Sequence, residues 1–177
     1  MSEVLTRAPG PAVLARGEWP AGPDDQPGTL PQIAGFVVSA FNPLVAQAAE
    51  RCLVARYGAA PADAEIGART GVVLASVRGD TATADAVRAA LLAGRRVPPL
   101  LFFQSNPNAV VGYVTARWGL AGPVACTSPA GDPLADGMAV AELLIADGAA
   151  DQVLVIAAEL ATSDDETDRA VAALVGP

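Results

Sequence analysis

The chain has 177 residues, the size of one domain, and carries 11 basic against 19 acidic residues for a formal net charge of −8. Its hydrophobic content of 52% excludes intrinsic disorder, and its 17 glycines and 15 prolines follow no period, which excludes collagen-like and repeat architectures. No apolar run reaches the length of a membrane span and the first residues lack the apolar core of a signal peptide, so we expect a cytoplasmic protein with no membrane partner.

All basic residues are arginines, and Arg95 and Arg96 form the only adjacent pair. Because a phosphate backbone is bound by clustered cations, a nucleic-acid partner is not expected. The absence of histidine and lysine excludes the commonest general bases, Ser-His and Cys-His nucleophiles, and Schiff-base chemistry. Cys52 and Cys126 lie far apart without a CxxC spacing, so we expect free thiols, no metal site and no other cofactor.

The first 31 residues are rich in proline and glycine, which predicts an extended N-terminal arm (1–31) with a short strand at 12–15, followed by one domain over 32–177. Asn42 and Pro43 have the residue types of an N-cap and a first helical position. Apolar residues then recur at helical spacing until Gly58. We therefore expect a helix from Pro43 to Tyr57, with Cys52 on the stripe that faces the core.

Further strands are predicted at 71–76, 124–127 and 152–158, where short apolar runs are bounded by glycine, proline or polar residues. Helical patterns fall between them, at 85–93, at 105–118, and from Asp132 and Pro133 to about Asp147. Strands separated by helices predict an α/β domain with a mainly parallel sheet. Periodicity alone fits residues 169–177 to a short helix.

Several motifs follow one another in a specific order along residues 36–159. They are GVVLAS at 71–76, PLLFF at 99–103, NAVVG at 108–112, WGLAGP at 118–123 and AELLIADGAADQVLV at 141–155, followed by Glu159. In this order and spacing the chain resembles the N-terminal half of the β-ketoacyl synthases. The resemblance implies half of a thiolase-like fold, an α/β structure with a mixed, mainly parallel sheet and flanking helices, in which residues 169–177 form the last strand.

The chain departs from this family at the catalytic positions. Counted without gaps, the cysteine nucleophile of a condensing synthase falls on Gly131, and the family's catalytic histidines belong to a half that the resemblance does not cover. A synthase thiol lies at a helix N-terminus that favours thiolate, whereas Asp132 is placed here to cap that terminus. We therefore expect no catalytic residue. Two alternatives remain, a catalytic carboxylate at Asp132 and an offset alignment that makes Cys126 the nucleophile.

An inactive ketosynthase homologue resembles the chain length factor of a type II polyketide synthase. This resemblance implies a non-catalytic subunit that pairs with a full-length ketosynthase, meets an acyl carrier protein transiently, and leaves the decarboxylative condensation to its partner. The alternatives are a scaffold or carrier-protein docking module without contact to the acyl tunnel, and a Cys126-dependent acyltransferase.

The resemblance also predicts two groups of residues in such a subunit. The expected tunnel residues are Phe102, Phe103, Gln104, Asn108, Val111 and Gly112, with the alternative that the two phenylalanines fill the core. The expected partner interface comprises Val110, Tyr113, Val114, Trp118, Val124, Ala125, Cys126 and Thr127.

Overall fold

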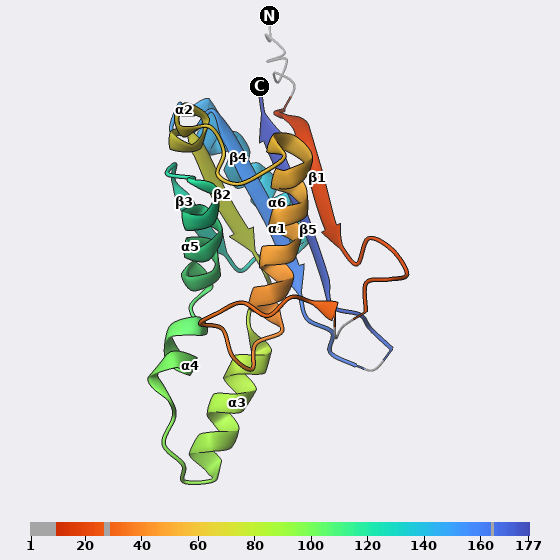
Figure 1. The fold of residues 1–177 in the computed structure, drawn as a ribbon, viewed down its shortest axis with the longest axis vertical. Helices are drawn as coiled ribbons and strands as arrows, with labels where there is room; N and C mark the ends of the chain where they lie inside the picture. Colours follow the sequence, from red (N-terminus) through yellow and green to blue (C-terminus); the bar gives the residue numbers. More distant parts are fainter. Residues whose placement is uncertain (1–9, 27–28, 164) are drawn as a thin grey trace, which may run out of the picture.

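The computed structural model describes residues 10–26, 29–163 and 165–177. Within them, helices and strands follow one another along the chain (Figure 1). In chain order the elements are β1 (Ala12–Trp19), α1 (Phe41–Tyr57), α2 (Ala64–Ala68), β2 (Thr70–Ala75), α3 (Thr81–Leu92), α4 (Pro99–Gln104), α5 (Pro107–Trp118), β3 (Val124–Thr127), α6 (Pro133–Ala146), β4 (Gln152–Glu159) and β5 (Arg169–Gly176).

The strands form one sheet in the order β1-β5-β4-β2-β3. β2 pairs in parallel with β3 and with β4, whereas β5 pairs antiparallel with β4 and with β1. All strands except β5 therefore point in one direction, which confirms the expected mixed, mainly parallel sheet. β1 and β3 form the two edges of this sheet.

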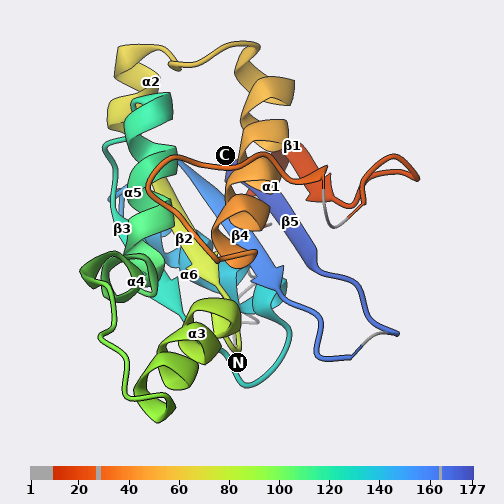
Figure 2. The same cartoon turned by 60° about the horizontal axis from the view of Figure 1, so that its bottom comes forward.

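Helices cover both faces of the sheet (Figure 2). α1 packs on β1, β5 and β4 and contacts α5, and the larger core cluster lies under these two helices. α6 packs on β4 and β2 from the opposite face, over a smaller core cluster. β2 is buried along its whole length, because it lies in the middle of the sheet with a helix on each face. α3 and α4 extend beyond the ends of the strands (Figure 1).

Residues 12–19 of the expected arm (1–31) form a strand of the sheet, which corrects the expectation of a largely extended arm. β1 runs to Trp19, beyond the expected strand at 12–15, and pairs with β5 from Ala12 opposite Gly176 to Trp19 opposite Ala170. A side chain at Gly17 would collide with the backbone of α1, so this glycine allows β1 to pass close under the helix. Of the predicted arm, residues 1–9 and 27–28 lie outside the described residues.

Asn42 does not cap α1, which is a second correction. The helix begins at Phe41, and Asn42 is fully buried in its first turn. Its amide donates hydrogen bonds to Ser39 Oγ at 2.8 Å and to Asp80 Oδ2 at 3.0 Å. The C-terminus is as predicted, because Gly58 follows Tyr57 with a positive φ of 82° and its N–H bonds to Val54 O.

The remaining elements agree with the sequence patterns to within a few residues, apart from four differences. The short helix α2, whose N-cap Asp63 accepts hydrogen bonds from the N–H groups of Glu65 and Ile66, was not predicted. α3 begins at Thr81, four residues before the expected start, because Asp80 accepts a hydrogen bond of 3.0 Å from the N–H of Thr83. Pro99 opens the short helix α4, for which periodicity gave no signal. Residues 169–176 form strand β5, as the family resemblance predicted and periodicity did not.

Candidate functional site

A pocket of about 370 Å³ lies where the parallel strands β2 and β3 end. Open α/β sheets bind ligands at the carboxyl ends of their strands, so this is the expected place for chemistry. Polar side chains from both strand ends and from the start of α3 line it, together with apolar ones: Phe41, Leu74, Ser76, Val77, Arg78, Gly79, Asp80, Ala84, Ser105, Pro107, Cys126, Thr127 and Ser128.

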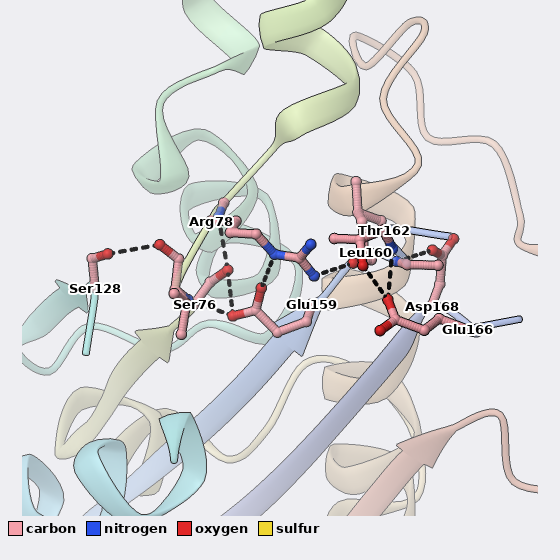
Figure 3. Close-up of polar contacts among 11 residues, drawn as sticks. Ser76, Arg78, Ser128, Glu159, Leu160, Thr162, Glu166 and Asp168 are labelled. Atoms are coloured by element: carbon pink, nitrogen blue, oxygen red, sulfur yellow. Dashed lines mark hydrogen bonds and ion pairs between the residues drawn. The ribbon is translucent and has the colours of Figure 1, made fainter. Parts of the chain in front are cut away.

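The charged side chains at this edge are paired with one another. Glu159 at the end of β4 accepts hydrogen bonds from Ser76 Oγ at 3.1 Å, from the backbone N–H of Val77, and from Arg78 Nε at 3.4 Å (Figure 3). Arg78 also donates to the backbone carbonyl of Leu160. This contact network fixes the strand ends. It leaves Arg78 directed at Glu159 rather than at the pocket.

Gly131 lies in the loop between β3 and α6, directly before the helix. Asp132 is the N-cap of α6, and its Oδ1 accepts a hydrogen bond of 2.8 Å from the N–H of Ala135. Pro133 takes the first helical position, so the capping predicted from the sequence is confirmed. A Cβ at Gly131 would meet nothing within 4 Å, so the position has room for a side chain.

Cys126 lies inside β3 and not in the turn before α6. Its thiol donates to Asn108 Oδ1 at 3.2 Å, and desolvation by the surrounding protein raises the pKa of the thiol. A raised pKa leaves less of the reactive thiolate at neutral pH. Cys52 is buried in the core under α1, where desolvation raises the pKa of its thiol to about 11.

A second hollow, which we call the apolar groove, has a volume of about 750 Å³ and lies between α4, the start of α5 and the loop before α1. Phe102 is 81% exposed and Phe103 is 63% exposed. Neither fills the core of this chain, which rules out that alternative. The groove is lined by Ala34, Gly35, Phe36, Leu100, Phe102, Phe103, Ser105, Asn106, Asn108, Ala109, Gly112 and Tyr113.

The structure brings four of the six expected tunnel residues together in this groove, Phe102, Phe103, Asn108 and Gly112. Gln104 and Val111 are buried in the interior and do not line it. Sequence reasoning missed Phe36, Leu100 and Tyr113 as lining residues. For Phe36 the available signal was the apolar segment 33–38, which forms no strand or helix.

Some residues of the expected partner interface are buried in the core and others are accessible. Val110, Val114 and Trp118 are buried in the core, so they contribute to no surface and this part of the expectation is corrected. They form the inward face of α5, because residues four apart lie on the same side of a helix. The other expected residues remain accessible: Tyr113, Val124 and Cys126 are exposed, and Ala125 and Thr127 are half-buried.

No group of three acidic or cysteine side chains that could hold a metal ion occurs within residues 10–26, 29–163 and 165–177. Across the same described ranges, no helix is both long and apolar enough to cross a membrane.

The sequence matches the family model described as the N-terminal domain of beta-ketoacyl synthase over residues 48–166. Comparison with curated proteins finds no match. Among solved structures, the fold is similar to a chain of a ketosynthase in complex with its chain length factor from Xenorhabdus doucetiae, with a TM-score of 0.70 and 17% identity over 96% of this chain and 79% of that chain.

Two further structures show the same fold. A chain of the ishigamide ketosynthase/chain length factor has a TM-score of 0.68 and 20% identity, over 88% of this chain and 48% of that chain. A beta-ketoacyl synthase from Burkholderia phymatum has a TM-score of 0.64 and 20% identity, over 83% of this chain and 46% of that chain. The chain thus spans about half the length of these two proteins.

Proposed function

The chain belongs to the family of β-ketoacyl synthase N-terminal domains, and from this we propose that it is a non-catalytic subunit, similar to a chain length factor, that pairs with a separate active ketosynthase. One observation carries the proposal. At the position of the family's nucleophile the chain has Gly131, while the strand before it and the capped helix after it keep the fold.

The chemistry of the remaining side chains supports this proposal. A condensing synthase needs a thiolate and groups that handle protons and stabilise the developing oxyanion. Here the N–H of Ala135 in the first turn of α6 is bound by Asp132, and the pKa of the Cys126 thiol is raised rather than lowered. The chain contains no histidine. We therefore assign the condensation of acyl chains on an acyl carrier protein to the partner.

The edge strand β3 supports the proposed pairing. Within the described residues only β2 pairs with it, so its other side is an edge that a partner's strand could pair with. Val124 on this strand is 47% exposed, which gives the edge an apolar side chain for a partner to cover. Asn108, which lines the apolar groove, accepts a hydrogen bond of 3.2 Å from the thiol of Cys126 on this strand and so links the two regions.

The apolar groove is the second surface that the proposal uses. Its volume lies in the range of sites that enclose small molecules, and most of its lining is apolar. A growing acyl chain is a flexible apolar ligand, so aromatic side chains at the end of its path stop elongation by steric overlap. In this role Phe102 and Phe103 would set the length of the product.

Co-expression with a candidate ketosynthase partner tests the proposal. We expect the two proteins to co-purify and to elute together in size exclusion, and the ketosynthase to condense malonyl units only in the complex. Cysteine substitution at Gly131 serves as the control and should leave the activity of the complex unchanged. A chain that condenses malonyl units by itself would contradict the proposal.

The alternative of a carrier-protein docking module is favoured by one separate observation. The exposed side chains of Arg95 and Arg96 make no ion pair within the described part of the chain, unlike Arg51, Arg69 and Arg117. They lie between α3 and α4 at the end farthest from the sheet (Figure 1). An unpaired cationic pair on an acidic protein suits an acidic protein partner.

The two roles are distinguished by charge reversal. If the chain binds the carrier protein, Arg95→Glu combined with Arg96→Glu should weaken carrier binding and reduce its dependence on salt. Arg56→Glu is the matched control, because Arg56 is equally exposed at the far end of α1. Unchanged binding of the carrier by the complex of the double variant would leave tunnel shaping as the function.

A further inference from the structure

Gln104 is a fully buried polar residue at the C-terminal end of α4. Its side-chain amide bonds to both backbone groups of Val37, accepting from the N–H at 2.9 Å and donating to the carbonyl. The same amide nitrogen donates to Thr83 Oγ1 at 2.8 Å. One side chain thus joins three separate segments, α4, α3 and the loop before α1.

The orientation of this amide is determined by its surroundings. A threonine hydroxyl has a single proton, and Thr83 uses it to donate to Asp80 Oδ2 at 2.6 Å. Thr83 Oγ1 must therefore accept from the nitrogen of Gln104, which directs the oxygen of the amide toward the N–H of Val37. Asn42 adds a hydrogen bond of 3.3 Å to the backbone carbonyl of Gln104.

The loop that Gln104 holds forms one wall of the apolar groove. Phe36, directly before Val37, lines the groove and meets the ring of Tyr113 edge-on, with ring centroids 6.2 Å apart. Val38, directly after it, has a positive φ of 69°, a conformation that a β-branched residue adopts only when its neighbours impose it. The two hydrogen bonds of Gln104 to Val37 are the contacts that hold the backbone here.

The other wall is covalently attached to the same residue, because Phe102 and Phe103 directly precede Gln104 in α4. We propose that Gln104 is a positioning residue that sets the distance between the two walls of the apolar groove, and so determines which length of acyl chain the groove accepts. The part that concerns acyl chains rests on the function proposed above. The part that concerns the shape of the groove does not.

The proposal depends on the amide group rather than on the size of the side chain. Methionine has a similar length but no donor and only a weakly accepting sulfur, so Gln104→Met should release the loop. Asparagine keeps the amide but is one methylene shorter, so it cannot reach Val37 and Thr83 together. The matched control is Gln26→Met, the same substitution at an exposed glutamine whose amide donates to Pro23 O in its own turn and which does not line the groove.

Fluorine NMR on the chain labelled with 3-fluorotyrosine measures the effect directly, since the chain has two tyrosines. Gln104→Met and Gln104→Asn should move the Tyr113 resonance toward its position in Phe36→Leu, which removes the ring contact. The resonance of Tyr57, which packs against Trp118 on the other side of α5, should stay in place and report that the variants are folded. Gln26→Met should move neither resonance.

Binding of the apolar dye 1-anilinonaphthalene-8-sulfonate provides a second measurement, with Gly112→Leu as the variant that blocks the groove. We expect a change in dye affinity of about fivefold in both Gln104 variants, the effect of disrupting one or two hydrogen bonds. An unmoved Tyr113 resonance in a folded Gln104 variant would overturn the proposal. If resonance and dye affinity change while the reconstituted complex makes the same products, the groove inference stands and the tunnel function fails.

Discussion

The carboxylate of Asp132 accepts a hydrogen bond of 2.8 Å from the backbone N–H of Ala135, directly after Gly131, which we propose to stand at the family's nucleophile position. An anion-binding helix end is thereby occupied by the chain's own side chain. On the proposed alignment this N-terminus is the one that activates a thiol in a synthase, and a capping residue of this type contributes about 1 kcal/mol of stability to it.

We therefore predict that the chain alone is not acylated by acyl carrier substrates. Gly131→Cys should not restore condensation, because a thiol without a base and oxyanion donors is one member of an incomplete set. The open space around Gly131 means that the variant will fold. Intact-mass measurement of the wild type and of Gly131→Cys shows whether either protein carries an acyl group. A covalent acyl adduct on the wild type that disappears in Cys126→Ser would establish Cys126 as a nucleophile.

The edge strand leads to a prediction about assembly. Val124→Lys places a charge on β3 and should abolish co-purification with the ketosynthase, since charged side chains protect sheet edges against pairing. Val13→Lys is the control, because Val13 is 58% exposed on β1 at the opposite edge of the same sheet. Size exclusion of the co-expressed pair measures the outcome. Equal loss of the complex in both variants would show that β3 is not the specific interface.

The exposed aromatic residues predict a change in product length. Phe102→Ala and Phe103→Ala should each lengthen the products of the reconstituted complex while changing the free energy of unfolding of this chain by no more than about 0.5 kcal/mol, as for other surface substitutions. Phe41→Ala is the contrast, because this fully buried phenylalanine should cost about 3–5 kcal/mol. Mass spectrometry of the products and urea unfolding give the two readouts. Identical product distributions would argue for a scaffold role.

A larger side chain at Gly112 should shorten the products of the complex. A Cβ at Gly112 would meet nothing within 4 Å, and the residue lines the apolar groove. Gly112→Leu should therefore fill the groove without a clash inside the chain, and should shorten the products of the complex. Gly112→Ala separates helix stability from volume, since alanine gains roughly 0.5–1 kcal/mol in a helix but adds only one methyl group. Products of unchanged length with leucine at this position would place the acyl chain elsewhere.

The ion pair between α1 and α5 predicts a dependence of stability on pH. Arg117 bonds Glu50 at 2.7 and 2.9 Å, and this side-chain hydrogen bonding lowers the pKa of Glu50 below its usual value of 4.5. A lowered folded-state pKa stabilises the fold above that value, and the contribution is lost as the pH falls through the lowered pKa. Glu50→Gln should thus destabilise the protein at pH 7 and less so at pH 3.

Urea unfolding of the wild type and of Glu50→Gln at pH 7 and at pH 3 measures how the loss of stability depends on pH. Trp118 Nε1 donates to the same carboxylate at 2.8 Å, and a glutamine oxygen can still accept that bond. The comparison therefore isolates the charge. A loss of stability that is equal at both pH values would show that the charge of Glu50 contributes nothing.

Local patterns in the sequence were sufficient for several parts of the fold. The strand at 124–127 and the capped start of α6 at Asp132 depend on β-branched residues, a capping carboxylate and a proline that act within a few residues of themselves. The order of motifs along residues 36–159 identified the family, which the match to its model over residues 48–166 confirms. These features could be predicted without knowing which distant segments are in contact, because they depend on short stretches of sequence and on their order.

Other parts depend on contacts between distant segments. A Pro- and Gly-rich stretch became the edge strand β1 because β5, over 150 residues later, offers it an antiparallel partner. An apolar residue is equally hydrophobic in a core and in a groove, so the sequence could not tell that Val110 faces inward and Phe102 faces outward. Those directions are decided by where α4 and α5 dock on the rest of the fold, since only packing determines which face of a helix is covered.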